Sequence, residues 1–284
     1  MLFGALAIVW FSEMVLWGFP AWSQAWTKVW RMIPSGNPQL AAALSITHAA
    51  EAPLKGALGV LAVFGLRSKN PSTRTALFLS MALVPPLNIA FQFRAQGFPL
   101  RSVAVATVFS IILWGSLFLF REPAPQTEAR GTEGPGQGAP SRWEAFQYGW
   151  FALNAALLTL LASLFLLGPT IALRFLLPCW FPLPDTSAGE VASLAISNLG
   201  TGSHLLALAT AGWIATVRFR SNPALRNAVA AAGTVNAGLV CLLPLRQILA
   251  QAGGSCATSS VLVLFVPLLV GWLLYAALSR DRSL

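Results

Sequence analysis

Long apolar runs separated by short polar segments constrain the fold of this chain more than any other feature. Several runs reach about 18 residues or more, the length at which an α-helix crosses the hydrocarbon core of a bilayer. The alternating segments of about ten residues that mark membrane β-barrels are absent from the sequence. Only 10% of the 284 residues are charged and 56% are hydrophobic, which is too little charge to coat a soluble globule of this size. The sequence therefore predicts an all-α integral membrane protein and excludes soluble enzyme folds.

We predict eight transmembrane helices along the chain. They cover residues 1–18, 39–66, 74–93, 102–120, 148–176, 189–217, 224–245 and 258–278. The first run carries Glu13 and lacks both a basic start and a small-residue cleavage site, so we expect a retained helix rather than a removed signal peptide. Residues 122–142 are rich in Pro, Gly and charge and have no apolar periodicity, which predicts a disordered linker.

The two halves of the chain match each other when the second is shifted by 152 residues. The motif Asn-Pro-x-x-Arg occurs at 70–74 and at 222–226, and in both halves an apolar helix and an Arg follow it. Asn before Pro is expected to end one helix and to cap the next, because Pro is tolerated in a first turn. A tandem duplication explains the match, and four predicted helices in each half give the copies the same orientation. The predicted domains are a four-helix repeat at 1–121, a cytoplasmic linker at 122–147 and a second, parallel four-helix repeat at 148–284.

The excess of basic residues concerns topology. Eighteen Lys and Arg against nine Asp and Glu give a formal net charge of +9. The basic residues lie at the ends of apolar runs, where they orient helices and meet lipid phosphates, and no basic stripe with interleaved aromatic residues is available for a nucleic acid. More of them fall on the side of the two termini than on the other side. We therefore expect a multi-pass protein of the cell (inner) membrane with both termini and the linker in the cytoplasm.

Three cysteines occur in the chain. Cys241 falls inside a predicted helix, where a Cys usually acts as a small hydrophobe. Cys179 and Cys256 fall in predicted loops on the non-cytoplasmic side, where a disulfide is chemically permitted. A bridge between these two residues and two free thiols are both compatible with the sequence, because a bridge depends on the distance between the Cα atoms.

The segment 47–56, THAAEAPLKG, is the most informative part of the sequence. His48, Glu51 and Lys55 are spaced i, i+3 and i+7, so they project from one face of a helix. Pro53 frees a backbone carbonyl, which is tolerated where protein or a polar cavity surrounds it. Charges at this depth normally face a bundle interior or a water-filled cavity. The segment predicts either a site that binds a ligand or relays protons, or a self-satisfied Glu51–Lys55 pair that fixes helix packing.

Further polar residues in predicted helices are candidates for the same site. Glu13 has no basic partner close in sequence, and it either completes the pocket or lies solvated near the interface. Asn88 and Gln92 are spaced i, i+4 on one helix, after two consecutive prolines. Both are included among the candidate ligand-binding residues.

The second half has not kept the charges. Ser203 and Ala207 stand at the positions equivalent to Glu51 and Lys55, so the sequence predicts at most one charged site. His204 shares a helix face with a Ser and a Thr. Small polar groups of this kind usually form hydrogen bonds between helices, and a ligand-binding role is the alternative.

The remaining observations concern chemistry. Nucleotide loops, zinc-protease motifs, Cys-x-x-Cys pairs and nucleophile elbows are missing from the sequence, which disfavours an enzyme. No metal or cofactor is predicted, although two helices that bring His48 and His204 leave bis-histidine haem as an alternative. The favoured function is binding of a lipid, quinone or other amphiphile in an intramembrane pocket, with membrane-complex subunits as candidate partners. The alternatives are a proton-coupled secondary transporter that uses Glu51 and a membrane redox subunit that binds haem or quinone.

The stretch from Glu51 to Met81, EAPLKGALGVLAVFGLRSKNPSTRTALFLSM, resembles the second and third helices of the DoxX-like four-helix membrane families. Those families show a Glu that opens helix two, a Gly-rich apolar helix that ends in Gly-Leu, a basic residue and then a helix of small residues. The H-x-x-E-A sequence from His48 to Ala52 is also similar to small eukaryotic four-helix membrane proteins. The resemblance implies an accessory membrane subunit near quinone or sulfur redox chemistry.

Overall fold

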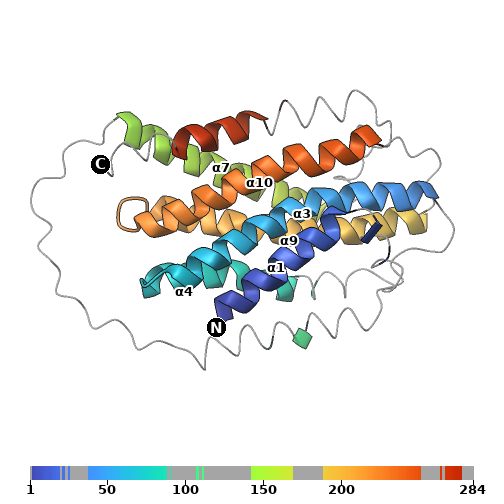
Figure 1. Cartoon of the computed structure of the whole chain (residues 1–284), viewed down its shortest axis with the longest axis horizontal. Coiled ribbons are helices and arrows are strands. Elements are labelled where there is room, and N and C mark those ends of the chain that lie inside the picture. Colours follow the sequence, from blue (N-terminus) through green and yellow to red (C-terminus); the bar gives the residue numbers. More distant parts are fainter. Residues whose placement is uncertain are drawn as a thin grey trace, which may run out of the picture.

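The computed structural model describes residues 2–19, 21–22, 25, 38–87, 90, 107–108, 111, 142–168, 188–250, 263 and 266–276. All regular secondary structure in these residues is helical, which confirms the predicted all-α class. The longer helices run roughly along the long axis of the molecule (Figure 1). They are α1 (Leu2–Gly18), α3 (Pro38–Arg67), α4 (Pro71–Ala82), α7 (Arg142–Leu167), α9 (Ala188–Val217) and α10 (Pro223–Ala250).

Three helical stretches among the described residues are long and apolar enough to cross a membrane. Large apolar side chains are exposed on the outside of the bundle, such as Leu160 at 68% and Leu167 at 78%. An exterior of this kind suits contact with lipid better than contact with water. The chain is therefore a helical membrane protein. The three stretches are Thr47–Arg67, Arg142–Leu167 and Pro223–Leu242, and Leu2–Gly18 and Val266–Ala276 form shorter apolar helices.

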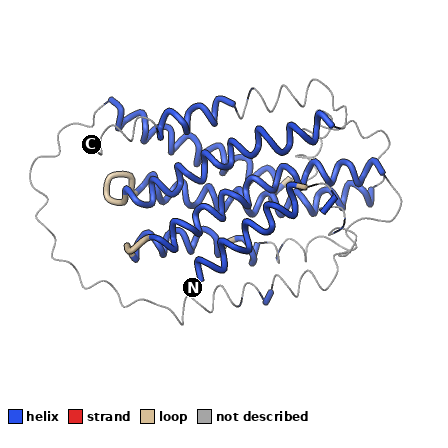
Figure 2. Tube along the Cα trace, in the orientation of Figure 1, coloured by secondary structure: helices blue, strands red, loops and turns tan. Residues whose placement is uncertain are grey.

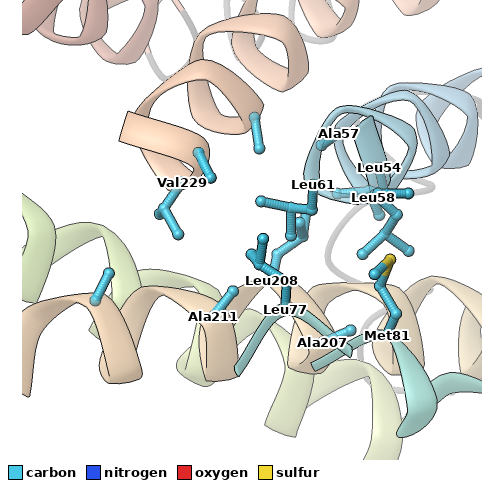
Figure 3. Close-up of a cluster of buried hydrophobic side chains, with 14 of the residues drawn as sticks. Leu54, Ala57, Leu58, Leu61, Leu77, Met81, Ala207, Leu208, Ala211 and Val229 are labelled. Carbon is cyan, nitrogen blue, oxygen red and sulfur yellow. The ribbon is translucent and has the colours of Figure 1, made fainter. Parts of the chain in front are cut away.

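Helices α3 and α9 form the centre of the bundle. Helix α3 contacts α1, α4, α9 and α10, and α9 also contacts α7, α4 and α10. Figure 3 shows Leu61 of α3 and Leu77 of α4 in the buried cluster that these helices share with α9 and α10. On α9, Ala207, Ala211 and Ala215 are almost fully buried, and their spacing of four residues places them on one face. Small residues at this spacing let helices approach closely, which is how helices pack in a membrane.

The Asn-Pro pairs mark the boundaries between consecutive helices, as the sequence predicted. Oδ1 of Asn70 accepts hydrogen bonds from the backbone N–H groups of Ser72 at 2.9 Å and Thr73 at 3.3 Å. In the second half, Oδ1 of Asn222 accepts from the backbone N–H of Leu225 at 3.0 Å. Each Asn therefore caps the helix that begins with the following proline, whose missing N–H would be unpaired in a first turn anyway.

Helix α4 is shorter than the sequence predicted. We expected a helix over 74–93, whereas α4 ends at Ala82 and a further helical stretch begins at residue 84. Pro85 and Pro86 explain the interruption, because two carbonyl groups in the last turn of α4 lose the backbone donors that would continue the helix.

Helix α7 begins at Arg142, inside the segment 122–147 that is predicted to be a linker. Its first turn carries Glu144, where a carboxylate is favoured by the helix dipole. That carboxylate also accepts a hydrogen bond at 2.7 Å from Nε of Arg220, at the end of α9. Trp143 is 54% exposed here, as expected for an aromatic residue at a membrane interface. The rest of the predicted linker lies outside the described residues.

Candidate functional site

Lys55 is the centre of a charged cluster between α1 and α3. Its Nζ lies 2.6 Å from Oε2 of Glu13 and 3.4 Å from Oε1 of Glu51. It also lies 4.5 Å from the ring centroid of Trp17, a cation–π contact. Lys55 and Glu51 are 3% and 5% exposed. A buried ammonium needs such partners, because an unpaired charge inside a membrane bundle is costly.

Helix α9 adds His204 to this cluster from the second half of the chain. Nδ1 of His204 lies 2.6 Å from the carbonyl oxygen of Gly200 and 3.3 Å from Oε1 of Glu51. Because both oxygens are acceptors, Nδ1 carries the proton and donates it. A Cβ at Gly200 would lie 3.5 Å from Oε1 of Glu51, an ordinary van der Waals contact, so the backbone of α9 passes close to the carboxylate. The cluster therefore contains groups from three helices.

His48 lies beside the cluster, with an aromatic ring between. Its ring centroid is 4.0 Å from that of Trp17 in an edge-on arrangement, and Trp17 also contacts the ammonium group of Lys55. His48 is 2% exposed. The predicted helix face of His48, Glu51 and Lys55 is thus present in the fold, and His48 forms its outer edge.

Among the described residues, the cluster contains two carboxyl groups and one ammonium group. The carboxyl groups of Glu13 and Glu51 both face the ammonium group of Lys55. The side chain of Glu13 is 40% exposed, whereas that of Glu51 is 7% exposed. Glu13 is therefore the open end of the cluster, where a donor group can reach a carboxylate that already accepts from Lys55.

Two buried polar atoms on the helix faces that carry the cluster lack a hydrogen-bond partner among the described residues. They are Nε1 of Trp10 and Oγ1 of Thr201. Trp10 precedes Glu13 by three residues on α1, and its ring packs edge-on against His204 with the centroids 5.5 Å apart. Thr201 precedes His204 by three residues on α9. Buried polar atoms are nearly always paired, so these two atoms indicate a site with unused hydrogen-bonding capacity.

The structure joins four of the residues that the sequence nominated. Glu13, Glu51, Lys55 and His204 form one chain of contacts, and Glu13 joins it while its side chain stays 40% exposed. Ser203 occupies the position equivalent to Glu51. Its hydroxyl group donates a hydrogen bond to the carbonyl oxygen of Gly200 in the same helix, at 2.7 Å. Asn88, Gln92, Cys179 and Cys256 lie outside the described residues. Cys241 is half-buried on α10 with a free thiol.

Sequence reasoning missed the two tryptophans of the site. Trp10, Glu13 and Trp17 are spaced i, i+3 and i+7, the same pattern that singled out His48, Glu51 and Lys55. Their spacing is visible in the sequence. The burial of Trp10 at 3% and of Trp17 at 9% places both inside the bundle.

In the part of the chain that the structure describes, no group of three or more His, Cys, Asp or Glu is placed to hold a metal ion. Comparison with family models, with curated proteins and with solved structures finds no match to this chain. The resemblance to DoxX-like proteins therefore stays a prediction, and the functional argument depends on the charged cluster.

Proposed function

We propose that this chain is a polytopic membrane protein that binds the polar head of a lipid, a quinone or another amphiphile at the charged cluster. The observation that carries the proposal is the pair of buried atoms without a described hydrogen-bond partner, Nε1 of Trp10 and Oγ1 of Thr201, each one helical turn from a residue of the cluster. An indole N–H donates to a carbonyl, ether or hydroxyl oxygen of a head group. Lipid or quinone tails suit the apolar walls of the bundle.

Removal of the free indole donor tests this proposal. Trp10→Phe keeps an aromatic ring against His204 and removes Nε1–H, so we expect about 2- to 10-fold weaker binding of an oxygen-bearing head group. Native mass spectrometry with decylubiquinone and with phosphatidylethanolamine as added probes measures the retained fraction. Trp213→Phe is the matched control, because Trp213 is 41% exposed and its N–H already donates to Thr159.

Two outcomes would contradict the binding proposal. One is equal retention of both probes by the wild type, Trp10→Phe and Trp213→Phe. The other is that neither probe binds the wild type above the level of an unrelated helical membrane protein. Thr201→Val, which removes the second unused atom at similar volume, is expected to weaken the same probe as Trp10→Phe.

A second candidate, a proton-coupled transporter, is favoured by the linear order of the ionisable groups. Glu13, Lys55, Glu51 and His204 follow one another at 2.6, 3.4 and 3.3 Å, from a half-exposed carboxylate to a buried imidazole. Hydrogen-bonded series of Glu and His are the usual form of a proton relay in membrane proteins. Glu51 lies between Lys55 and His204 in this series, so it is the proton-coupling carboxylate of this proposal.

Glu51→Gln is expected to abolish any proton flux that the wild type shows, because the amide does not take up a proton. The measurement is dissipation of an imposed pH gradient by proteoliposomes that contain a pH-sensitive dye. Glu144→Gln is the control at the end of the bundle, since Glu144 pairs with Arg220. If wild-type proteoliposomes hold the pH gradient for as long as protein-free liposomes do, transport is refuted. The binding proposal is not affected by that result.

We also propose the finer architecture, eight membrane helices as two parallel four-helix repeats with the termini and linker in the cytoplasm. Matching helix bounds support it, because α3 and α9 each have 30 residues and the next helix begins at proline in both halves. The contacts between helices also repeat from one half to the other. Helix α1 packs on α3 as α7 does on α9, and α10 packs on α3 as α4 does on α9.

A further inference from the structure

The two Asn-Pro motifs meet at one end of the bundle, away from the charged cluster. Figure 2 shows the loops before α4 and before α10 at the same end. Oγ1 of Thr73 on α4 donates to Oδ1 of Asn222 at 2.9 Å, and the pair is buried. The Arg218 guanidinium donates to the hydroxyl of Ser72. The helix N-termini of α4 and α10 are therefore linked side by side.

This end of the bundle is strongly basic. Residues 67–74 and 218–226 contain three Lys or Arg each and no Asp or Glu. Glu144 of α7 approaches the region and pairs with Arg220, so the formal charge of the two segments together with Glu144 stays strongly positive. Two helix N-termini add the positive ends of their dipoles.

The amide of Asn222 is fixed in one orientation. Its Oδ1 accepts from the backbone N–H of Leu225 at 3.0 Å and from the hydroxyl of Thr73, so Nδ2 is the free end and offers two donors. Asn222 is 4% exposed, and Nδ2 has no acceptor among the described residues. An amide flip would place the Nδ2–H donors of Asn222 against the N–H donor of Leu225. The hydrogen bonds therefore fix which atom is Oδ1 and which is Nδ2.

A second donor without an acceptor lies one turn further along α10. Nε of Arg226 is buried and has no hydrogen-bond partner among the described residues. Its guanidinium carbon lies 4.8 Å from the ring centroid of Phe219, which holds the guanidinium plane in place. Asn222 and Arg226 are spaced i, i+4, so the two donors share a face at the start of α10.

We propose that this junction, defined by Thr73, Asn222, Arg226 and Arg218, binds a phosphate group. Three features of this junction favour an anionic acceptor with several oxygens. They are the unused donors, the surplus positive charge and the two helix N-termini. The span Thr47–Arg67 ends at this junction and the span Pro223–Leu242 begins there. The junction is therefore at the level of lipid head groups. An anionic phospholipid and a free phosphate share this chemistry.

Asn222→Asp is the test, because it replaces the free donor by a negative oxygen and keeps the oxygen that caps α10. The aspartate keeps an oxygen for Leu225 and Thr73, so the helix cap survives, while the two Nδ2 donors are replaced by a negative oxygen. We expect about 10-fold or greater loss of phosphate-group binding. Asn70→Asp makes the same charge change at the equivalent cap of α4 and is expected to leave binding within about 2-fold of the wild type.

Two probes distinguish the sources of the phosphate. Native mass spectrometry measures how much phosphatidylglycerol, relative to phosphatidylcholine, stays bound after extraction from mixed nanodiscs. The shift of the thermal unfolding midpoint with inorganic phosphate, relative to chloride at equal ionic strength, measures the free anion. A response to either probe that Asn222→Asp removes and Asn70→Asp keeps supports the site and names its source.

Arg226→Lys provides a second test that does not depend on Asn222. It keeps the positive charge and removes Nε–H, so a built phosphate site weakens whereas general attraction to an anionic surface does not. Equal loss in Asn222→Asp and Asn70→Asp, or no preference of the wild type for either probe, would overturn the proposal. Circular dichroism of each variant verifies that the helices remain.

Discussion

Replacement of Lys55 by Met is expected to lower the free energy of unfolding by about 3–5 kcal/mol. Lys55 is 3% exposed, and its ammonium group lies between the carboxylates of Glu13 and Glu51. Met fills a similar volume without the charge, so the buried carboxylate of Glu51, whose side chain is 7% exposed, loses its ammonium partner. Equilibrium unfolding in detergent micelles of increasing dodecyl sulfate content, followed by circular dichroism, measures the loss.

The matched control removes all three charges together. Lys55→Met combined with Glu13→Gln and Glu51→Gln is expected to recover most of the lost stability, because replacement of a whole buried ion cluster by neutral groups is often close to neutral. The triple variant also tests the idea if the single variant is too unstable to purify. A triple variant as unstable as Lys55→Met alone would show that Lys55 acts through packing rather than through charge.

Leu61→Ala is expected to lower the free energy of unfolding by about 2–4 kcal/mol. Leu61 is fully buried where α3, α4, α9 and α10 meet (Figure 3), and lipid does not refill a cavity at that depth. Leu66→Ala is the control on the same helix, because Leu66 is 53% exposed and its loss is expected to change stability by no more than about 0.5 kcal/mol. The same unfolding experiment measures both variants.

Equal losses at Leu61 and Leu66 would contradict the packing of α3 at the centre of the bundle. A smaller loss at Leu61 than at Leu66 would mean that the exposed face of α3 is the packed one. Both variants keep the length and the charge of the helix, so differences in extraction or expression do not account for such a result.

The break between helices at each Asn-Pro pair was predictable, because local rules fix it. α3 begins and ends within one residue of its predicted bounds, and α9 likewise. The end of α4 was missed, although Pro85 and Pro86 were visible, because a kink and a full interruption have the same sequence signature. The early start of α7 was missed because Pro- and Gly-rich residues precede it.

The charged cluster was half predictable for a similar reason. Glu51 and Lys55 are four residues apart on one helix, so their pairing follows from helix geometry alone. The contact from Glu13 depends on how α1 packs on α3, and the contact from His204 depends on how α9 packs on α3. No local pattern specifies such packing. The unused donor of Trp10 is visible only when every neighbour of the indole has been placed.

The hydrogen bond between Thr73 and Asn222 has a mechanical consequence. It joins a helix of the first half to the capping residue of a helix of the second half, so the halves cannot separate at that end without breaking this buried hydrogen bond. Glu13 lies about three turns along α1 from Phe3, whose ring contacts Gly65 and Arg74 near the same end. Any widening of the bundle is therefore expected to pivot about the linked Asn-Pro loops and to be largest beyond Glu13, where an amphiphile would enter.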